Sequence, residues 1–394
     1  MRLTFFMLAD LRTGRGTENV LFNLLKYKPS DVDITIVEPD NLESGRISSE
    51  EVKKLTSKCK IIRIHRQRYN INMDTLFKRA YVNLILRPYY KNLKDTKLKG
   101  LLPDIQNTDI VYLFLNEYSI FFKGVNIPII GSGHTLDIPH FLDEHSIFHR
   151  LSSIIIHYMY FKNINGFNYF PKDSKVFNKL KDKWHLKYNF PLPPGVDTEL
   201  FYPDSHEPGS KIKILFVAAL EYSKGLDLLI PIMEKFHGND EIEFHIAGKG
   251  SLENKISKIK YVNYHSGLDN QALAELYRSC DVFIYPSHSD AYPAVVSQAF
   301  SSGLYILMGN FFKGIFDNFN KYLEYLPMNV DAFYNRINDI IKDRTIIDHN
   351  KQEEYDYVKN NYDWSIVAKK FYTNMQNIYD EFYQNRKGED SPKD

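Results

Sequence analysis

The sequence predicts an α/β protein of two facing domains, each with a doubly wound parallel sheet. Apolar segments of strand length alternate with segments of helical periodicity along the chain. The alternation stops at Phe190–Pro208, which contains five prolines, and then starts again. A chain of 394 residues is long enough for two domains that each bury their own core. We therefore expect two Rossmann-like domains, an N-terminal one over residues 1–190 and a C-terminal one over residues 191–363.

The first half begins with a buried strand and a glycine-containing loop. A helix from about Glu18 to Tyr27 follows, and its apolar side chains fall on one face. The expected strands of this half are Arg2–Ala9, Ile34–Val37, Ile61–Ile64, Ile110–Leu115 and Ile127–Gly131. Strands that alternate with helices favour a parallel sheet wound on both faces.

The second half repeats this pattern. Its expected strands are Ile212–Val217, Ile242–Ala247, Val282–Tyr285 and Tyr305–Met308. Its expected helices are Gly225–Phe236, Gln271–Ser279 and Val295–Ser302. A last amphipathic helix over residues 364–385 precedes the polar tail 386–394, which we expect to be disordered.

The composition favours a cytoplasmic protein that is at most peripheral on the inner face of a membrane. The two cysteines, Cys59 and Cys280, fall in different halves, which argues against a disulfide framework or a cysteine metal site. The first residues lack the apolar core and cleavage site of a signal peptide. No apolar run reaches the roughly 20 residues that span a bilayer.

Positive charge is concentrated in the first half. Residues 1–190 carry 29 Lys and Arg against 19 Asp and Glu, and the stretch Lys58–Lys99 carries 12 against 2. Aromatic residues and the apolar run Val82–Leu86 lie within this stretch. The mixture suits an anionic membrane surface or a lipid-phosphate acceptor, and a solvated basic helix is the alternative. No nucleic-acid recognition module is evident.

Ligands of parallel sheets bind beyond the carboxyl ends of the strands, so the loops after strands are the candidate sites. Leu11–Glu18 contains Gly14 and Gly16, which let backbone approach a ligand, but it lacks the third glycine of a dinucleotide fingerprint. Ala218–Gly225 places Lys224 before a helix, where cation and helix N-terminus can share a diphosphate. The alternatives are a tight turn for the first loop and a solvated lysine for the second.

Two more loops carry polar side chains. In Pro286–Ser302, Asp290 and Gln298 can present oxygen and amide groups to sugar hydroxyls. A turn-forming aspartate and a helix-surface glutamine are the alternatives. Gly131–Phe141 follows a strand of the first half, so we expect His134 to point into the cleft between the domains.

Two acidic or histidine-rich segments resemble metal sites only superficially. His140, His145 and His149 lie close together in sequence, but no zinc signature accompanies them, so we expect no metal there. The sequence DVD at Asp31–Asp33 precedes a strand instead of ending one, and turn residues explain it better.

These segments together resemble glycosyltransferase family 4, also described as glycosyl transferases group 1, over nearly the whole chain. PPGVDTELF is similar to the family's interdomain PNGVDxxxF, and ILFVAALEYSKGLDLLI to its FVGRLxxxKGxDxLI. FHIAGKGSLENKI resembles IxGxGxxxxxL, and DAYPAVVSQAFSSG takes the place of EGFPxxxxEAxAxG. NYDWSIVAKKFYTNMQNIY resembles the closing helix, which in the family packs back on the N-terminal domain. The resemblance implies the GT-B fold and a nucleotide-diphosphate sugar as donor.

The resemblance also implies roles for individual residues. Gly16 lies in the loop that approaches the donor diphosphate, and Lys224 matches the lysine that binds it. Asp290 matches the first glutamate of the E-x7-E motif, which contacts the donor sugar. Gln298 matches the second glutamate, which holds the ribose hydroxyls. His134 stands where many members have a histidine near the reacting sugar and the acceptor.

Three donor-site positions depart from the family pattern. Asp290 is one methylene shorter than glutamate, and Gln298 lacks its charge. Ala219 stands where the family has an arginine, and losing such a cation costs about 3 kcal/mol of transition-state stabilisation. Arg12 and Arg15 are the candidate substitutes for it at the diphosphate.

The resemblance thus implies a retaining hexosyltransferase without cofactor or obligatory metal. His134 and Asp290 are its expected catalytic residues, and backbone groups near Ala291 and Tyr292 orient the sugar. The acceptor is expected to be a glycan, a lipid-linked molecule or another hydroxyl compound. The alternatives are a sugar-nucleotide epimerase, a catalytically impaired homologue that acts as a binding partner, and a nucleotide-dependent dehydrogenase.

Overall fold

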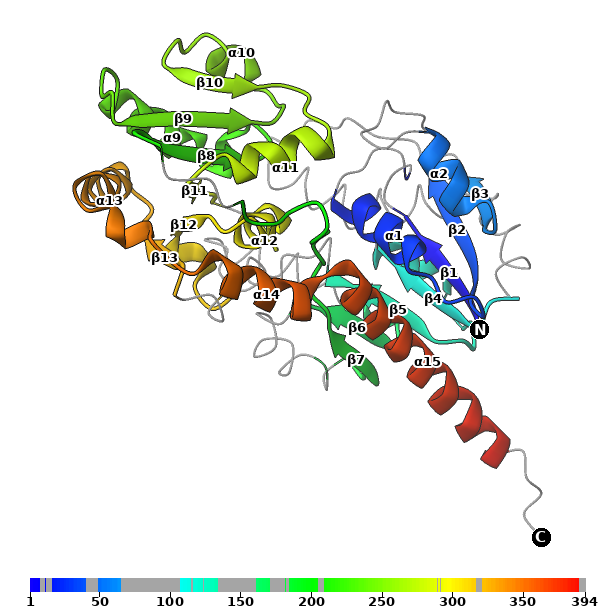
Figure 1. Ribbon diagram of the computed structural model, residues 1–394. Helices are drawn as coiled ribbons and strands as arrows, with labels where there is room; N and C mark the ends of the chain where they lie inside the picture. The colour runs from blue at the N-terminus through cyan, green and yellow to red at the C-terminus, as the bar shows by residue number, and fades with distance from the viewer. Residues whose placement is uncertain are drawn as a thin grey trace, which may run out of the picture. The chain divides into compact units, whose positions relative to one another are not determined.

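A computed structural model gives the architecture of the chain (Figure 1). It describes residues 1–7, 11, 16–39, 49–64, 107–114, 116–122, 124–133, 161–170, 181, 184–204, 209–288, 290, 292–316 and 321–389. The chain divides into two compact units, Met1–Pro193 with Ala368–Asp394, and Pro194–Val367. Each unit contains one parallel sheet, which confirms the predicted class of two Rossmann-like domains.

The first unit contains a sheet in the order β3-β2-β1-β4-β5-β6-β7, with every neighbouring pair parallel. Its strands are β1 (Arg2–Phe6), β2 (Asp33–Pro39), β3 (Lys60–Ile64), β4 (Ile110–Leu113), β5 (Ile129–Ser132), β6 (Gly166–Tyr169) and β7 (Tyr188–Pro191). Its other elements are α1 (Gly16–Lys26), α2 (Ser49–Thr56) and the 3-10 helix η3 (Asn116–Phe122). The strand order reverses between β1 and β4, so the loops after these two strands leave the sheet side by side.

Alternate residues of β1 build the two faces of this core. Phe5 stacks on Phe371 with ring centroids 5.9 Å apart, whereas Phe6 packs on Phe122 at 5.3 Å. Successive side chains of a strand point to opposite faces, so β1 is buried on both. This double burial explains why β1 is apolar throughout its second half and shows no alternation of polar residues.

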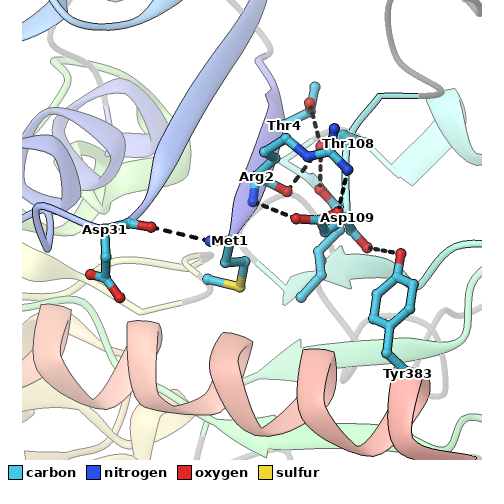
Figure 2. A network of polar contacts seen from close by, with 8 residues as sticks. Met1, Arg2, Thr4, Asp31, Thr108, Asp109 and Tyr383 are labelled. Atoms are coloured by element: carbon cyan, nitrogen blue, oxygen red, sulfur yellow. Dashed lines mark hydrogen bonds and ion pairs between the residues drawn. The ribbon is translucent and has the colours of Figure 1, made fainter. Parts of the chain in front are cut away.

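The last helix, α15 (Trp364–Glu389), covers one face of the first sheet (Figure 1). Tyr372 donates a hydrogen bond from its hydroxyl to the carbonyl of Leu24 in α1 at 2.9 Å. Figure 2 shows Tyr383 of the same helix beside the start of β1, where Arg2 and Asp109 form an ion pair at 2.7 Å. The helix continues through residues 386–389, which corrects the expectation that the disordered tail begins at 386.

The second unit contains a sheet in the order β10-β9-β8-β11-β12-β13, again parallel throughout. Its strands are β8 (Ile212–Val217), β9 (Ile242–Ala247), β10 (Val262–His265), β11 (Val282–Tyr285), β12 (Tyr305–Gly309) and β13 (Leu323–Leu326). Its α-helices are α9 (Leu226–Lys235), α10 (Glu253–Ile256), α11 (Asn270–Arg278), α12 (Ala294–Ser301), α13 (Val330–Lys342) and α14 (Lys351–Tyr362). The 3-10 helices η6 (Tyr222–Lys224), η7 (Asn310–Phe312) and η9 (Arg344–Ile347) complete it.

A buried acid lies next to a histidine at the start of α14. Glu354 is 1% exposed, and its Oε2 lies 3.1 Å from Nε2 of His349. The other ring nitrogen, Nδ1, lies 2.8 Å from the carbonyl oxygen of Ile347 and must donate to it, so Nε2 accepts. Burial raises the pKa of Glu354 well above its ordinary 4.5 and lowers the pKa of His349 below 6.5. The pair is therefore a neutral carboxylic acid that donates to a neutral imidazole.

We expect the unchanged protein to become less stable as the pH rises above about 6.5, and we expect Glu354→Gln to abolish this decrease. Between the ordinary pKa values of 4.5 and 6.5, the unfolded pair holds one proton, as many as the folded neutral pair, so stability is flat there. Above pH 6.5 the unfolded histidine is neutral and the unfolded glutamate is ionised, while the folded acid keeps its proton. The free energy of unfolding then falls by up to about 1.4 kcal/mol per pH unit.

Glutamine has no proton to lose and can still donate to His349. Urea unfolding at about pH 6 and about pH 8 should show the unchanged protein losing roughly 2.7 kcal/mol relative to the variant, which is one proton over two pH units. An equal change in both proteins would contradict the neutral pair.

Within the described part of the chain, no helix has both the length and the apolar character needed to cross a membrane.

Candidate functional site

Two of the candidate loops leave the second sheet at neighbouring strands. β8 and β11 pair in parallel, although β9 and β10 lie between them in the sequence. The strand order reverses at this pair, so the loops after β8 and β11 flank the carboxyl edge of the sheet together. Ligands of open parallel sheets bind at such a reversal.

The backbones of these two loops are in contact. The amide of His288 donates to the carbonyl of Ser223 at 3.0 Å, and the Ser287 hydroxyl donates to the same oxygen at 3.3 Å. Gly225 has φ 84°, and a Cβ there would lie 2.0 Å from the carbonyl oxygen of Pro286. Both the backbone angle and the lack of space require glycine at this position. The loop that carries Lys224 is thereby held against the loop after β11.

Lys224 and Asp290, both predicted from the sequence, form an ion pair with Nζ and Oδ2 2.8 Å apart. The hydroxyl of Tyr285 donates to the same Oδ2 at 2.8 Å. Burial raises the pKa of Tyr285 well above its ordinary value, so the hydroxyl stays protonated and donates. The side chains of Lys224 and Asp290 are 24% and 25% exposed, so a ligand in solution can reach them.

A second tyrosine lies beside the predicted residue Gln298, which is half-buried in α12. The hydroxyl of Tyr277 donates to the carbonyl of Val295 at 3.1 Å and lies 3.4 Å from Oε1 of Gln298. Burial raises the pKa of Tyr277 well above its ordinary value, so it too remains a donor. Tyr292, which precedes α12, is 8% exposed and packs its ring on Phe316 at 5.0 Å.

The position of the missing arginine, Ala219, is exposed on the loop after β8. Two residues later, the carboxylate of Glu221 accepts hydrogen bonds from the amide and hydroxyl of Ser251 at 2.8 and 2.5 Å. These bonds lower the pKa of Glu221, so the group is a carboxylate at neutral pH. They join the loop after β8 to the loop after β9 and do not replace the missing cation.

In the first unit, Gly16 is the exposed first residue of α1, and a Cβ there would meet no atom of the other described residues within 4 Å. Packing against the described part of the chain therefore does not explain this glycine. Glu38 is the second-last residue of β2, near the strand end where dinucleotide-binding domains have an acidic residue for the ribose. Its carboxylate is bound by Arg63 Nε at 3.2 Å and by the amide of Leu11 at 3.4 Å. The sequence pattern did not point to Glu38, and the engagement of its carboxylate by Arg63 and Leu11 argues against a dehydrogenase.

Ser132, the last residue of β5 before the loop that contains His134, is held by a buried asparagine. Asn116, which is 3% exposed, donates from Nδ2 to the carbonyl of Ser132 at 2.8 Å and accepts from its amide at 2.9 Å. This double hydrogen bond holds the last residue of β5 to the loop after β4. A buried asparagine that replaces a strand partner in this way has no signal in the sequence.

Several predicted residues lie outside the part of the chain that the structure describes. They are His134, Ala291, Arg12 and Arg15, together with the histidines 140, 145 and 149 and the basic stretch beyond Ile64. Among the described residues, no three or more His, Cys, Asp or Glu side chains are grouped so that they could hold a metal ion.

The described site combines a cation, a carboxylate and the starts of two helices. Lys224 and the N-terminus of α9 suit a phosphate or diphosphate, because both favour negative charge. Asp290 and the amide of Gln298 suit hydroxyl groups. An anionic ligand that also carries hydroxyls fits this chemistry.

A model of the family described as glycosyl transferases group 1 matches residues 197–362. An uncharacterised glycosyltransferase of Methanocaldococcus jannaschii is 25% identical over 215 residues, which cover 49% of this chain and 54% of that protein. The gpi3 subunit of the phosphatidylinositol N-acetylglucosaminyltransferase of Schizosaccharomyces pombe is 24% identical over 206 residues, which cover 48% and 42%. The chain spans about half the length of these curated relatives.

The Anabaena protein HepE, solved in complex with UDP and glucose, has a similar structure with a TM-score of 0.65. The two proteins are 12% identical, and the match covers 95% of this chain and 99% of HepE. At this identity the similarity shows the fold alone, which is the GT-B arrangement of two Rossmann-like domains.

Proposed function

Because residues 197–362 belong to the glycosyl transferases group 1 family and the chain has the GT-B fold, we propose that this protein is a glycosyltransferase. Its donor is a nucleotide-diphosphate sugar. One observation carries the proposal: Lys224 and Asp290, 66 residues apart, meet at 2.8 Å where the strand order of the sheet reverses. A cation for the diphosphate and a carboxylate for the sugar are thus brought together on one edge.

In the proposed reaction the bond between the anomeric carbon and the diphosphate oxygen breaks, and the acceptor oxygen bonds to the same face of that carbon. Lys224 and the start of α9 stabilise the charge that grows on the departing diphosphate. That diphosphate takes the acceptor proton, so no further base is needed. Asp290 and backbone groups near Ala291 and Tyr292 orient the sugar, and His134 lies near the reacting carbon. This scheme retains the anomeric configuration and uses no obligatory metal.

For the acceptor we propose a lipid-linked hydroxyl compound at the cytoplasmic face of a membrane. The basic and aromatic stretch Lys58–Lys99 supports this, because such side chains bind anionic lipid surfaces. The relative from Schizosaccharomyces pombe, by its name, acts on phosphatidylinositol. Sedimentation with vesicles that contain anionic phosphatidylglycerol, but not with pure phosphatidylcholine vesicles, is the expected result.

The donor proposal is tested by thermal unfolding with UDP, GDP and ADP and with UDP-glucose, GDP-mannose and ADP-glucose. A ligand at about 100 times its Kd stabilises the folded state by about 2.7 kcal/mol. We expect one nucleotide series to raise Tm and the other two to have little effect. No response to any of them at about 1 mM would reject the donor proposal.

Product analysis separates the enzyme classes. A transferase releases much more nucleoside diphosphate with an acceptor than without one. An epimerase converts the nucleotide sugar without any acceptor. Binding without either product would identify a catalytically impaired homologue.

A further inference from the structure

Tyr285 is the last residue of β11, and its ring is held inside the second unit. The side chain is 1% exposed. Its ring lies 6.4 Å from Phe216, 6.0 Å from Phe283 and 5.7 Å from Phe312, measured between centroids. Three aromatic neighbours fix the ring, so the hydroxyl has a fixed position at the carboxyl edge of the sheet.

That hydroxyl and the ammonium of Lys224 bind the same oxygen of Asp290, each at 2.8 Å. The two donors differ in kind. The hydroxyl is neutral and rigidly held, whereas the ammonium is charged and stands on a flexible chain. Only the ammonium suits a phosphate strongly, because its attraction to an anion is charge-assisted.

A donor diphosphate creates a conflict at this site. Two anions, the diphosphate and Asp290, then converge on one cation, and they repel each other. With a diphosphate bound, the ammonium would turn toward it, and its hold on the carboxylate would weaken. A neutral donor that stays on Oδ2 keeps the carboxylate in place.

We propose that Tyr285 is a positioning residue of the donor site, which holds the Asp290 carboxylate toward the sugar when the diphosphate engages Lys224. This inference rests on the proposed function. Tyr285 acts through Asp290 and makes no contact with the donor itself. Phenylalanine would fill the same space but could not hold the carboxylate.

The test is Tyr285→Phe, compared with Tyr372→Phe. The control also removes one buried hydroxyl, which donates to the carbonyl of Leu24 at 2.9 Å in the first unit. Calorimetry measures the Kd of UDP and UDP-glucose, or of GDP and GDP-mannose, whichever pair stabilises the unchanged protein. Steady-state kinetics give kcat and KM with the same donor.

We expect Tyr285→Phe to change the Kd of the bare nucleoside diphosphate by less than about twofold. The Kd of the nucleotide sugar should rise, and kcat/KM should fall about ten- to hundredfold, as for a lost hydrogen bond to a charged group. Tyr372→Phe should change none of these quantities. In the Asp290→Ala background, Tyr285→Phe should cause no further loss, because the group that it positions is absent.

Equal weakening of bare diphosphate and nucleotide sugar by Tyr285→Phe would overturn the inference, since it would indicate a general loss of structure. The inference would also be overturned if Tyr285→Phe bound and turned over the nucleotide sugar as well as the parent protein does. If the unchanged protein bound none of the nucleotides, the proposed function itself would fail, and that result is seen before any variant is made.

Discussion

Replacement of Lys224 by alanine is expected to lower kcat/KM for transfer about 10²- to 10³-fold. The departing diphosphate gains negative charge as the bond to the sugar breaks, so a cation beside it stabilises the transition state more than the bound donor. Ala219 stands where the family has an arginine, so the described part of the donor site relies on Lys224 for this charge. The Kd of the bare nucleoside diphosphate should rise as well.

Lys235→Ala is the matched control for this variant. Lys235 ends α9, is 43% exposed and pairs with Asp331 at 2.7 Å, so its loss removes the same charge away from the site. Lys235→Ala should leave kcat/KM unchanged, so the kcat/KM values of the two variants should differ by the same 10²- to 10³-fold. Both should unfold within about 1 kcal/mol of the parent protein, because partly exposed ion pairs contribute little to stability. A loss of less than about fivefold for Lys224→Ala would remove it from the proposed mechanism.

Gly225→Ala is expected to destabilise the second unit by more than about 3 kcal/mol. The position has φ 84°, which costs any residue with a Cβ, and that Cβ would lie 2.0 Å from the carbonyl oxygen of Pro286. The clash can be relieved only by moving the two loops apart. Such a movement would separate Lys224 from Asp290, so binding of nucleotide should be lost in the fraction that folds.

Gly238→Ala separates the cost of the positive φ from the cost of the close approach to Pro286. Gly238 has φ 85°, close to that of Gly225, but a Cβ there would meet no other atom within 4 Å. Its variant should lose only about 1 kcal/mol, from the backbone angle alone. The difference between the two variants in urea unfolding measures the cost of the close approach. Equal losses would show that the loops near Gly225 are not tightly packed.

The sequence located the central strands of the second sheet well. The predicted strands Ile212–Val217, Ile242–Ala247 and Val282–Tyr285 have the bounds of β8, β9 and β11. Each is flanked by polar or turn residues, and its apolar side chains are buried in the sheet. Local composition is enough to identify such strands.

Four short strands, β6, β7, β10 and β13, were missed, and all but β6 lie at an edge of their sheet. β6 (Gly166–Tyr169), β10 (Val262–His265) and β13 (Leu323–Leu326) are four residues long, and each includes polar side chains. Asn168 of β6 is buried, and its side chain accepts a hydrogen bond from the hydroxyl of Tyr112 at 2.8 Å and donates one to the carbonyl of Phe190 at 3.4 Å. Segments of this kind become strands through pairing with a neighbour, and that pairing is not encoded locally.

At the site, the sequence identified the two charged residues and missed the tyrosine between them. Lys224 and Asp290 stand out because they are charged residues in loops that follow strands. Tyr285 looks like any aromatic residue of a buried strand, and its ring does pack in the core. Its hydroxyl has a function only because the strand ends next to Asp290.

By itself, the sequence determined that the chain forms two Rossmann-like domains and which loops carry its charged groups, because both follow from local patterns of burial and turns. The tertiary structure alone decided that Lys224 and Tyr285 both donate to one carboxylate oxygen of Asp290, which lies 66 residues from Lys224 in the chain. The reason is strand order: β8 and β11 are neighbours in the sheet and not in the chain. That order results from the burial of the whole sheet, so no single segment encodes the site.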